Sequence, residues 1–288
     1  MDGELLGVIL QVSLLVFVVS SMLAMGFSLT MPEIIEPLKD VRLVLIALAV
    51  NFVAVPIIAW AIDAVLSLDE DLSIGLTIMA AAAGAPFLPK LAGAAKGNMA
   101  FSVGLMVLLM VVTVAYMPIV LPLLIDGVDV NTWDIASSLI FLMILPLAIG
   151  LFVRWRYEDI AEGLQPLMAQ TSTIAIALLL VAGVIVNFDD IVDLIGTGGF
   201  AAIVLFLAGA FLVGYFAAGS DPGTRSVMGL GTAQRNLSAA LVVGGQNFPD
   251  NPGVVTFIIV AGIVGLILLL PGAGELGKRA EASTSTPA

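Results

Sequence analysis

The chain has no cysteine and no histidine among its 288 residues. Without cysteine it can form no disulfide and has no thiolate for catalysis or metal binding. Without histidine it lacks the usual general base and the commonest metal ligand. An enzyme working inside a membrane would also need a nucleophile and a base, and no apolar run here carries a pair of acids at mid-depth. The sequence therefore predicts no enzymatic activity and no cofactor.

Charge is also scarce. Only 11% of the residues are charged and 60% are hydrophobic, with a mean hydropathy of +1.16, whereas soluble domains carry about a quarter charged residues. The apolar residues form runs of roughly twenty, the length that crosses a hydrocarbon core of about 30 Å. The composition predicts an all-α polytopic membrane protein.

The apolar runs between charged or Gly/Pro-rich breaks predict nine transmembrane spans. They cover about residues 5–29, 43–65, 72–95, 99–125, 133–153, 164–186, 200–218, 227–245 and 254–270. Residues 1–272 would then form one transmembrane domain. The short polar segment 273–288 is expected to be a disordered cytoplasmic tail.

The basic residues outside the predicted spans are unevenly distributed between the two sides of the membrane. If the spans alternate in direction, eight of the ten basic residues fall on one side of the membrane: Lys39, Arg42, Lys96, Arg154, Arg156, Arg225, Lys278 and Arg279. The other side carries only acids: Asp2, Glu4, Asp69, Glu70, Asp71, Asp126, Asp129, Asp134, Asp189, Asp190, Asp193 and Asp250. Basic loops favour the cytoplasm, so we expect an outer N-terminus and an inner C-terminus in the cytoplasmic (inner) membrane. The two remaining basic residues, Lys90 and Arg235, lie inside spans.

Two of the nine spans are interrupted. The third contains Gly84, Pro86 and Pro89, and the eighth contains the polar stretch GTAQRN at 231–236. Proline removes a backbone donor and clashes one turn back, so the third span is expected to break, although a simple kink is the alternative. If spans one to four and six to nine are inverted copies, these two spans correspond and cross in opposite directions. Interrupted segments at corresponding positions of two halves indicate the central site of a transporter.

Charges within the spans indicate the substrate. An ionised side chain at the bilayer centre is costly. Lys90 could snorkel toward the cytoplasmic face, but Arg235 lies about ten residues from either end of its span. A ligand that supplies the missing countercharge would be an organic anion, and a carboxylate matches the guanidinium fork. We expect the substrate site to contain Arg235, Lys90, Asn236, Thr232, Pro86 and Pro89.

Other polar residues also lie in the middle of spans. Asn51 is expected to face the same place. Ser102 and Thr113 either line the cavity or bond back to their own helix.

Several stretches together resemble the bile acid:sodium symporter family. They are MLAMGFSLTMPE at 22–33, AKGNMAFSVGL at 95–105, MPIVLPLL at 117–124 and GTAQRNLSAALVV at 231–243. The resemblance covers most of the chain and depends on the order of the pieces. It implies a panel of about 5–29 and 133–186 beside a core of about 43–125 and 200–270, with the broken helices crossing in the core. Family members often have ten helices, and the first is expected to be lacking here.

The resemblance also implies two sodium ions behind the crossover. Asn51 and Gln234 fall where amide ligands of sodium sit, and Ser102 falls where a hydroxyl ligand sits. A Ser-Asn ligand pair is replaced by Leu88 and Pro89, however, and an acidic ligand is replaced by Leu230. The ammonium of neighbouring Lys90 is therefore expected to replace at least one sodium ion. The alternatives are a remaining sodium site around Asn51 and Gln234, and coupling to protons through Lys90.

These inferences lead to a secondary active transporter of a small or amphipathic organic anion that works by alternating access with an altered sodium site. Keto acids, pantothenate-like acids and sulfonates all fit this description. Alternatives are a sodium-independent or proton-coupled facilitator or exporter and, more distantly, a membrane receptor or assembly protein. The expected partners are the anion and membrane lipid, with no nucleic acid.

Overall fold

The computed structural model describes residues 3–125, 132–186, 196–249 and 251–285, together with residues 188, 192 and 194. This part of the chain is built from helices and contains no strand. The first half contains α1 (Gly3–Ser28), α2 (Met31–Ile35), the 3-10 turn η1 (Glu36–Lys39), α3 (Val41–Ala49), the π-helical turn η2 (Val50–Ala54), α4 (Val55–Leu66), α5 (Glu70–Ala81), α6 (Leu88–Ala94) and α7 (Met99–Leu124). The second contains α8 (Thr132–Leu139), the π-helical turn η3 (Ile140–Ile144), α9 (Leu145–Arg156), α10 (Glu158–Val186), α12 (Gly199–Ala217), α13 (Pro222–Ala233), α14 (Leu237–Asn247) and α15 (Pro252–Ser285).

Seven helical stretches of the described chain are long and apolar enough to cross a membrane. They correspond to the predicted spans one, two, four, five, six, seven and nine. The second of them joins α3, η2 and α4, and the fourth joins α8, η3 and α9. The predicted third and eighth spans are instead formed by two shorter helices each, α5 with α6 and α13 with α14. The all-helical, multi-pass character is thus confirmed. The two spans built from shorter helices are the two that the sequence predicted to be interrupted.

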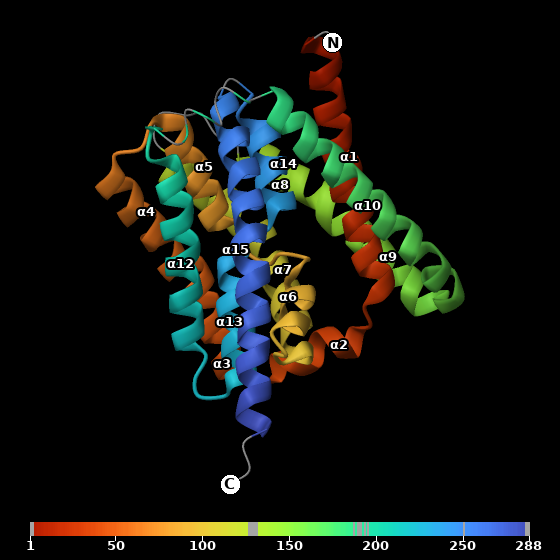
Figure 1. Ribbon diagram of the computed structural model, residues 1–288. Coiled ribbons are helices and arrows are strands. Elements are labelled where there is room, and N and C mark those ends of the chain that lie inside the picture. The colour runs from red at the N-terminus through yellow and green to blue at the C-terminus, as the bar shows by residue number, and fades with distance from the viewer. Residues whose placement is uncertain are drawn as a thin grey trace.

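The helices form two groups around the long helix α15 (Figure 1). Helix α1 packs along α10 and α9 on one side, and α12 packs on α13 and α4 on the other. A close approach of α1 and α9 depends on Gly26 and Gly150, because a Cβ on Gly26 would lie 2.7 Å from the Cα of Gly150. Small residues allow helices to pack this closely in membranes.

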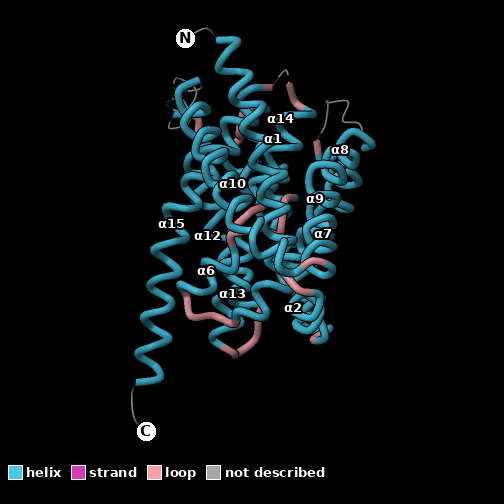
Figure 2. The backbone as a smooth tube through the Cα atoms, turned by 90° about the vertical axis from the view of Figure 1, so that its right-hand side faces the viewer, coloured by secondary structure: helices cyan, strands magenta, loops and turns pink. Residues whose placement is uncertain are grey.

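The start of α1 and the end of α15 lie at opposite ends of the molecule (Figures 1 and 2). Helix α2, the connection between α12 and α13, and the end of α15 share one end, and most of the basic segments identified in the sequence lie near them. Part of the acidic side falls outside the described residues: Asp2, Asp126, Asp129, Asp189, Asp190, Asp193 and Asp250.

The C-terminal segment is helical, which corrects the expectation of a disordered tail from residue 273. Helix α15 runs 34 residues to Ser285. Extending an existing helix is far easier than nucleating one, and the pair Glu275–Arg279 (3.2 Å) adds support one turn apart. Glu281 also forms an ion pair with Lys96 after α6. The composition of the tail does not indicate this helix, because the helix depends on the apolar helical segment that precedes the tail.

The break between α5 and α6 follows from Pro86. In a continuing helix the carbonyl of Ala82 would accept from residue 86, but proline has no N–H and its ring clashes with that carbonyl. Helix α5 ends at Ala81, and Gly84 turns the chain with a φ of +80°, a conformation that favours glycine. Pro89 lies in the first turn of α6, where a missing N–H costs nothing. The segment is therefore broken by one proline and restarted with the other, and is not simply kinked.

The break between α13 and α14, at residues 234–236, contains no proline or glycine. In a continuing helix the Asn236 N–H would donate to the Thr232 carbonyl, but Nη1 of Arg235 donates to that carbonyl instead (3.0 Å). The Asn236 N–H donates to the carbonyl of Ala82 (2.8 Å). The Asn236 side chain caps α14 by accepting from the N–H of Ala239 (3.1 Å). The polar cluster itself ends the helix.

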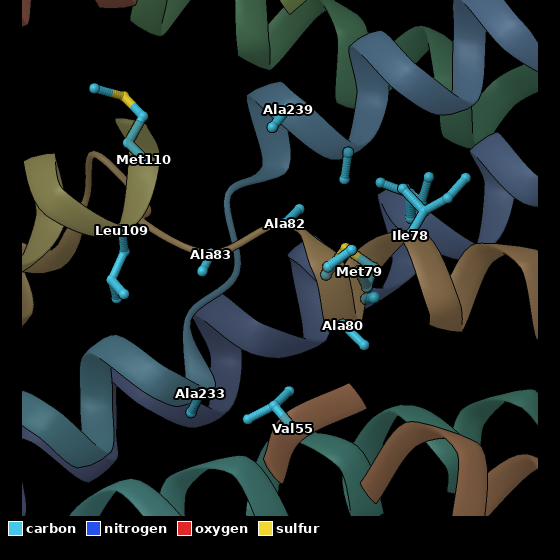
Figure 3. Packing of buried hydrophobic residues seen from close by; sticks show 14 of the residues in the cluster. Val55, Ile78, Met79, Ala80, Ala82, Ala83, Leu109, Met110, Ala233 and Ala239 are labelled. Carbon is cyan, nitrogen blue, oxygen red and sulfur yellow. The ribbon is translucent and has the colours of Figure 1, made fainter. Parts of the chain in front are cut away.

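The two breaks cross each other. In Figure 3 the extended stretch that carries Ala82 and Ala83 passes the non-helical stretch between Ala233 and Ala239. The N–H of Ala83 donates to the hydroxyl of Thr113 in α7 and the hydroxyl donates to the Ala83 carbonyl, each at 3.0 Å. Nδ2 of Asn236 donates to the carbonyl of Gly84 (3.0 Å). Side chains thus replace the missing helical bonds, as a break inside a membrane requires.

Replacing Thr113 by valine tests this arrangement. The shape is kept, but the Ala83 carbonyl loses its donor, and the Ala83 N–H keeps only its bond to the Ala81 carbonyl (3.2 Å). An unsatisfied buried group costs about 1–3 kcal/mol. We expect the Thr113→Val protein to unfold several degrees below the wild type in detergent, as followed by tryptophan fluorescence. Thr171→Val is the matched control, because the Thr171 hydroxyl bonds only to the Leu167 carbonyl of its own helix. Equal melting of the two variants would contradict the proposed role of Thr113.

Candidate functional site

Arg235 lies at the crossover and is 4% exposed. Its guanidinium makes four hydrogen bonds. Nε donates to the carbonyl of Met79 (2.9 Å) and Nη2 donates to the carbonyl of Ala80. Nη1 donates to Oδ1 of Asn51 (2.9 Å) and to the carbonyl of Thr232 (3.0 Å). The arginine that looked unpartnered in the sequence is thus almost fully hydrogen-bonded.

These partners carry no formal charge. The carbonyls of Met79 and Ala80 belong to the last turn of α5, where helical acceptors lack partners and the helix dipole is negative. No carboxylate of the described residues forms an ion pair with Arg235. Asp63, near the end of the predicted span 43–65, accepts from the hydroxyl of Ser73 (2.7 Å). The guanidinium therefore acts as a positively charged cap on the end of α5.

Asn51 is held by the π-helical turn η2 and uses both ends of its amide. Nδ2 donates to the carbonyl of Ala47 (3.0 Å) and to Oγ1 of Thr232 (3.3 Å), while Oδ1 accepts from Arg235. Single π-helical turns are frequent at functional sites. In this structure the turn places a buried amide against the crossover.

Tyr116 supports this turn and was missed by the sequence reasoning. Its hydroxyl donates to the carbonyl of Phe52 (2.7 Å). That carbonyl has no partner four residues later, because residue 56 is a proline. A proline within a span was the available signal that a side chain must satisfy the carbonyl one turn earlier.

A cavity of about 590 Å³ lies beside the crossover. Its wall comes from α1 and α10 on one side and from α6, α7, α14, α15 and the two breaks on the other. Most of the wall is apolar, and the described lining residues include two cations, Lys90 and Arg235, and no acid. Lys90 is exposed, with its Nζ 5.4 Å from the centre of the Phe87 ring. The cavity is therefore an apolar space with a positive wall.

Helix α10 contributes a polar strip that the sequence reasoning did not identify. Gln165, Ser172 and Thr173 line the cavity, and spacings of seven and eight residues put them on one helix face. On the opposite wall, Oε1 of Gln234 is buried and has no hydrogen-bond partner among the described residues. The cavity thus has polar residues on both walls.

The structure separates the residues predicted for the site into two sets. Arg235, Lys90, Pro86, Pro89 and Gln234 line the cavity. Thr232, Asn236 and Asn51 are fully buried at the crossover, where they contact Arg235 or the α5–α6 break. Ser102 belongs to neither set, because its hydroxyl bonds back to the Met99 carbonyl of its own helix (2.7 Å). Thr113, for which the sequence left two readings, binds the backbone of the crossover.

The residues that the resemblance assigns to sodium are engaged in separate contacts in this structure. Hard cations take several oxygen ligands at once. Oδ1 of Asn51 is already the acceptor for Arg235, and Ser102 points to its own helix. Oε1 of Gln234 is buried and has no hydrogen-bond partner among the described residues. No cluster of acidic ligands occurs in the described part of the chain.

Comparisons with known proteins agree with the sequence resemblance. The model of the Sodium Bile acid symporter family matches residues 14–194, more than half of the chain. The chain is also 22% identical over 275 residues to a protein of Arabidopsis thaliana named "Probable sodium/metabolite cotransporter BASS3, chloroplastic". The match covers 92% of this chain and 64% of the relative, so the chain spans less than two thirds of the relative's length.

Single cysteines can test the division between cavity and crossover, because the natural chain has none. We expect Lys90→Cys to react with a water-soluble thiol reagent in the folded protein, since residue 90 is exposed in the cavity wall. Thr232→Cys should react only after unfolding, because burial denies the reagent access. Mass spectrometry of the intact protein gives both extents. Equal labelling of the two folded variants would contradict the placement of Thr232.

Proposed function

Because the chain belongs to the sodium bile acid symporter family, we propose that it carries an organic anion with an apolar body across a membrane by alternating access. Members of this family are transporters and not enzymes, in keeping with the lack of histidine and cysteine. The substrate class rests on one observation: the described residues that line the cavity are mainly apolar and include two cations but no acid. An apolar wall favours an apolar body, and the cations favour a negative group.

The two cations have different parts in this proposal. Lys90 is exposed, so its ammonium can reach the acidic group of the substrate directly. Arg235 is held by four hydrogen bonds and adds its positive field at the cavity wall. Gln234 lies in the same wall, but its Oε1 is buried away from the cavity space. Pro86 and Pro89 shape the wall, while Thr232 and Asn236 hold the crossover behind it.

The size of the cavity also favours an amphipathic substrate. At about 590 Å³ it falls within the usual range for drug-sized ligands, about 300–1,000 Å³. A keto acid would leave much of the apolar wall uncovered. A carboxylate or sulfonate with a larger apolar body would fill it.

The arrangement of the helices supports a rocking mechanism. We assign α1 and α8 to α10 to a panel and α3 to α7 and α12 to α15 to a core. The cavity lies where the two groups meet. The corresponding breaks of α5–α6 and α13–α14 suit an inverted repeat, in which such segments form the central site. Tilting of the panel against the core would expose the cavity first to one side and then to the other.

The charge distribution supports an outer N-terminus and an inner C-terminus in the cytoplasmic membrane. All eight basic residues outside the predicted spans would then face the cytoplasm. The chain's three tryptophans, Trp60, Trp133 and Trp155, are exposed. Tryptophan is typical of membrane–water interfaces, so lipid is the natural neighbour of these faces.

Neutralising Lys90 tests the role of the cavity in uptake. For Lys90→Met we expect a fall in uptake of an anionic probe such as cholate into proteoliposomes, with KM raised about 10-fold or more, since a hydrogen bond to a charged group contributes about 1.5–3 kcal/mol. Lys90→Arg should retain most of the uptake.

Lys39→Met is the control, because Lys39 lies outside the cavity wall and forms an exposed pair with Glu36 (3.8 Å). Octanoate and octanamide, which share an apolar chain but differ in charge, provide matched competitors. Inhibition by both to the same degree, or normal uptake by Lys90→Met, would remove the basis for an anion site. Accumulation against a gradient separates active transport from facilitated diffusion.

A further inference from the structure

The end of α5 has the chemistry of a cation site. Two backbone carbonyls, from Met79 and Ala80, point away from the last turn of a broken helix, and the amide oxygen of Asn51 and the carbonyl of Thr232 converge with them. In transporters with broken helices, the C-terminal ends of half-helices and unwound carbonyls are the groups that coordinate Na⁺ or H⁺. The dipole of α5 adds negative potential at the same point.

A positively charged side chain of the protein itself already occupies this position. The four oxygens accept hydrogen bonds from the guanidinium of Arg235, which is 4% exposed and forms no ion pair with a carboxylate of the described residues. An arginine placed only to bind a substrate would direct its fork toward the cavity. Here most of the donors point into the protein, toward the crossover.

The positive charge also opposes a second cation nearby. A sodium ion at the end of α5 would have to displace the guanidinium from oxygens that it holds, or lie against a like charge in a site of low dielectric. Among the residues that the resemblance assigns to sodium, Gln234 has a side-chain oxygen with no hydrogen-bond partner among the described residues. Gln234 directly precedes Arg235 in the chain.

We propose that the guanidinium of Arg235 is a resident cation of the crossover, which takes the place that a coupling sodium ion would occupy at the end of α5. The crossover is then complete without bound sodium. This inference concerns the core and does not depend on which anion the cavity accepts, so it can fail or hold independently of the proposed transport function.

Thermal unfolding of the purified full-length chain tests the inference without any substrate. The wild type should melt at the same temperature in sodium chloride and in choline chloride, each at about 100 mM so that screening is constant. Arg235→Gln keeps a polar side chain but removes the charge, which leaves the carbonyls of α5 without their cap. We expect its melting temperature to fall by about 5–10 °C. Guanidinium chloride at about 20 mM, far below denaturing concentrations, or sodium should restore at least half of that loss, with saturation, and choline should not.

Arg225→Gln is the matched control. Arg225 lies in α13 and, like Arg235, donates from Nε to a backbone carbonyl, that of Tyr215 (3.3 Å), and its guanidinium stacks on the Tyr215 ring. This variant should show no cation-specific recovery, because its arginine caps no broken helix.

Arg235→Lys serves as a second variant in case Arg235→Gln does not fold. Its ammonium keeps a positive charge at the end of α5, so it should fold and remain indifferent to sodium. Saturable stabilisation of the wild type or of Arg235→Lys by sodium over choline would overturn the inference. So would an Arg235→Gln protein that melts like the wild type and responds to no cation.

Discussion

The fold depends on the exchange of hydrogen bonds between two non-helical stretches inside a membrane protein. Each backbone group left unsatisfied in hydrocarbon costs several kcal/mol, so neither the α5–α6 break nor the α13–α14 break would persist alone. Each is stable because it meets the other. Asn236 donates to both Ala82 and Gly84, and Thr113 binds the backbone of Ala83 from the neighbouring helix. The crossover is thus a single cooperative unit.

This unit explains how a buried arginine is tolerated. Breaking α5 leaves the carbonyl of Ala80 without a helical partner and that of Met79 with only a long bond (3.3 Å) from the N–H of Ala82. Ending α13 leaves the carbonyl of Thr232 free. The guanidinium of Arg235 binds all three. The cost of burying the charge is offset by acceptors that the break itself creates, and the charge in turn stabilises the break. Lys90 has no such set of oxygens among the described residues and stays exposed in the cavity, so the two cations within the broken segments are suited to different tasks.

Much of the architecture could be predicted from composition and pattern. The apolar runs indicated the long helices, Pro86 indicated the broken third span, and the polar cluster around Arg235 indicated a second interrupted span. The family resemblance is confirmed by the match over residues 14–194. The tail was wrongly expected to be disordered, since its helix depends on continuity with α15 and on contact with Lys96. The cavity face of α10 was missed because weakly polar residues in a span give no signal until their neighbours are known. The role of Tyr116 was missed although Pro56 indicated that the Phe52 carbonyl needs another donor.

The sequence by itself determined which segments are apolar enough to span a membrane, where a helix cannot continue and which two basic residues lie among them, because these depend on local chemistry. Only the tertiary structure decided what those residues face. The partner of Arg235 was expected to be a bound anion. Its nearest oxygens come instead from Met79, Ala80 and Asn51, about 155 to 185 positions away in the chain. A local pattern can show that a charge needs a partner. The partner is selected by the packing of segments distant in sequence, since that packing places the carbonyls of one broken helix beside the side chain of another.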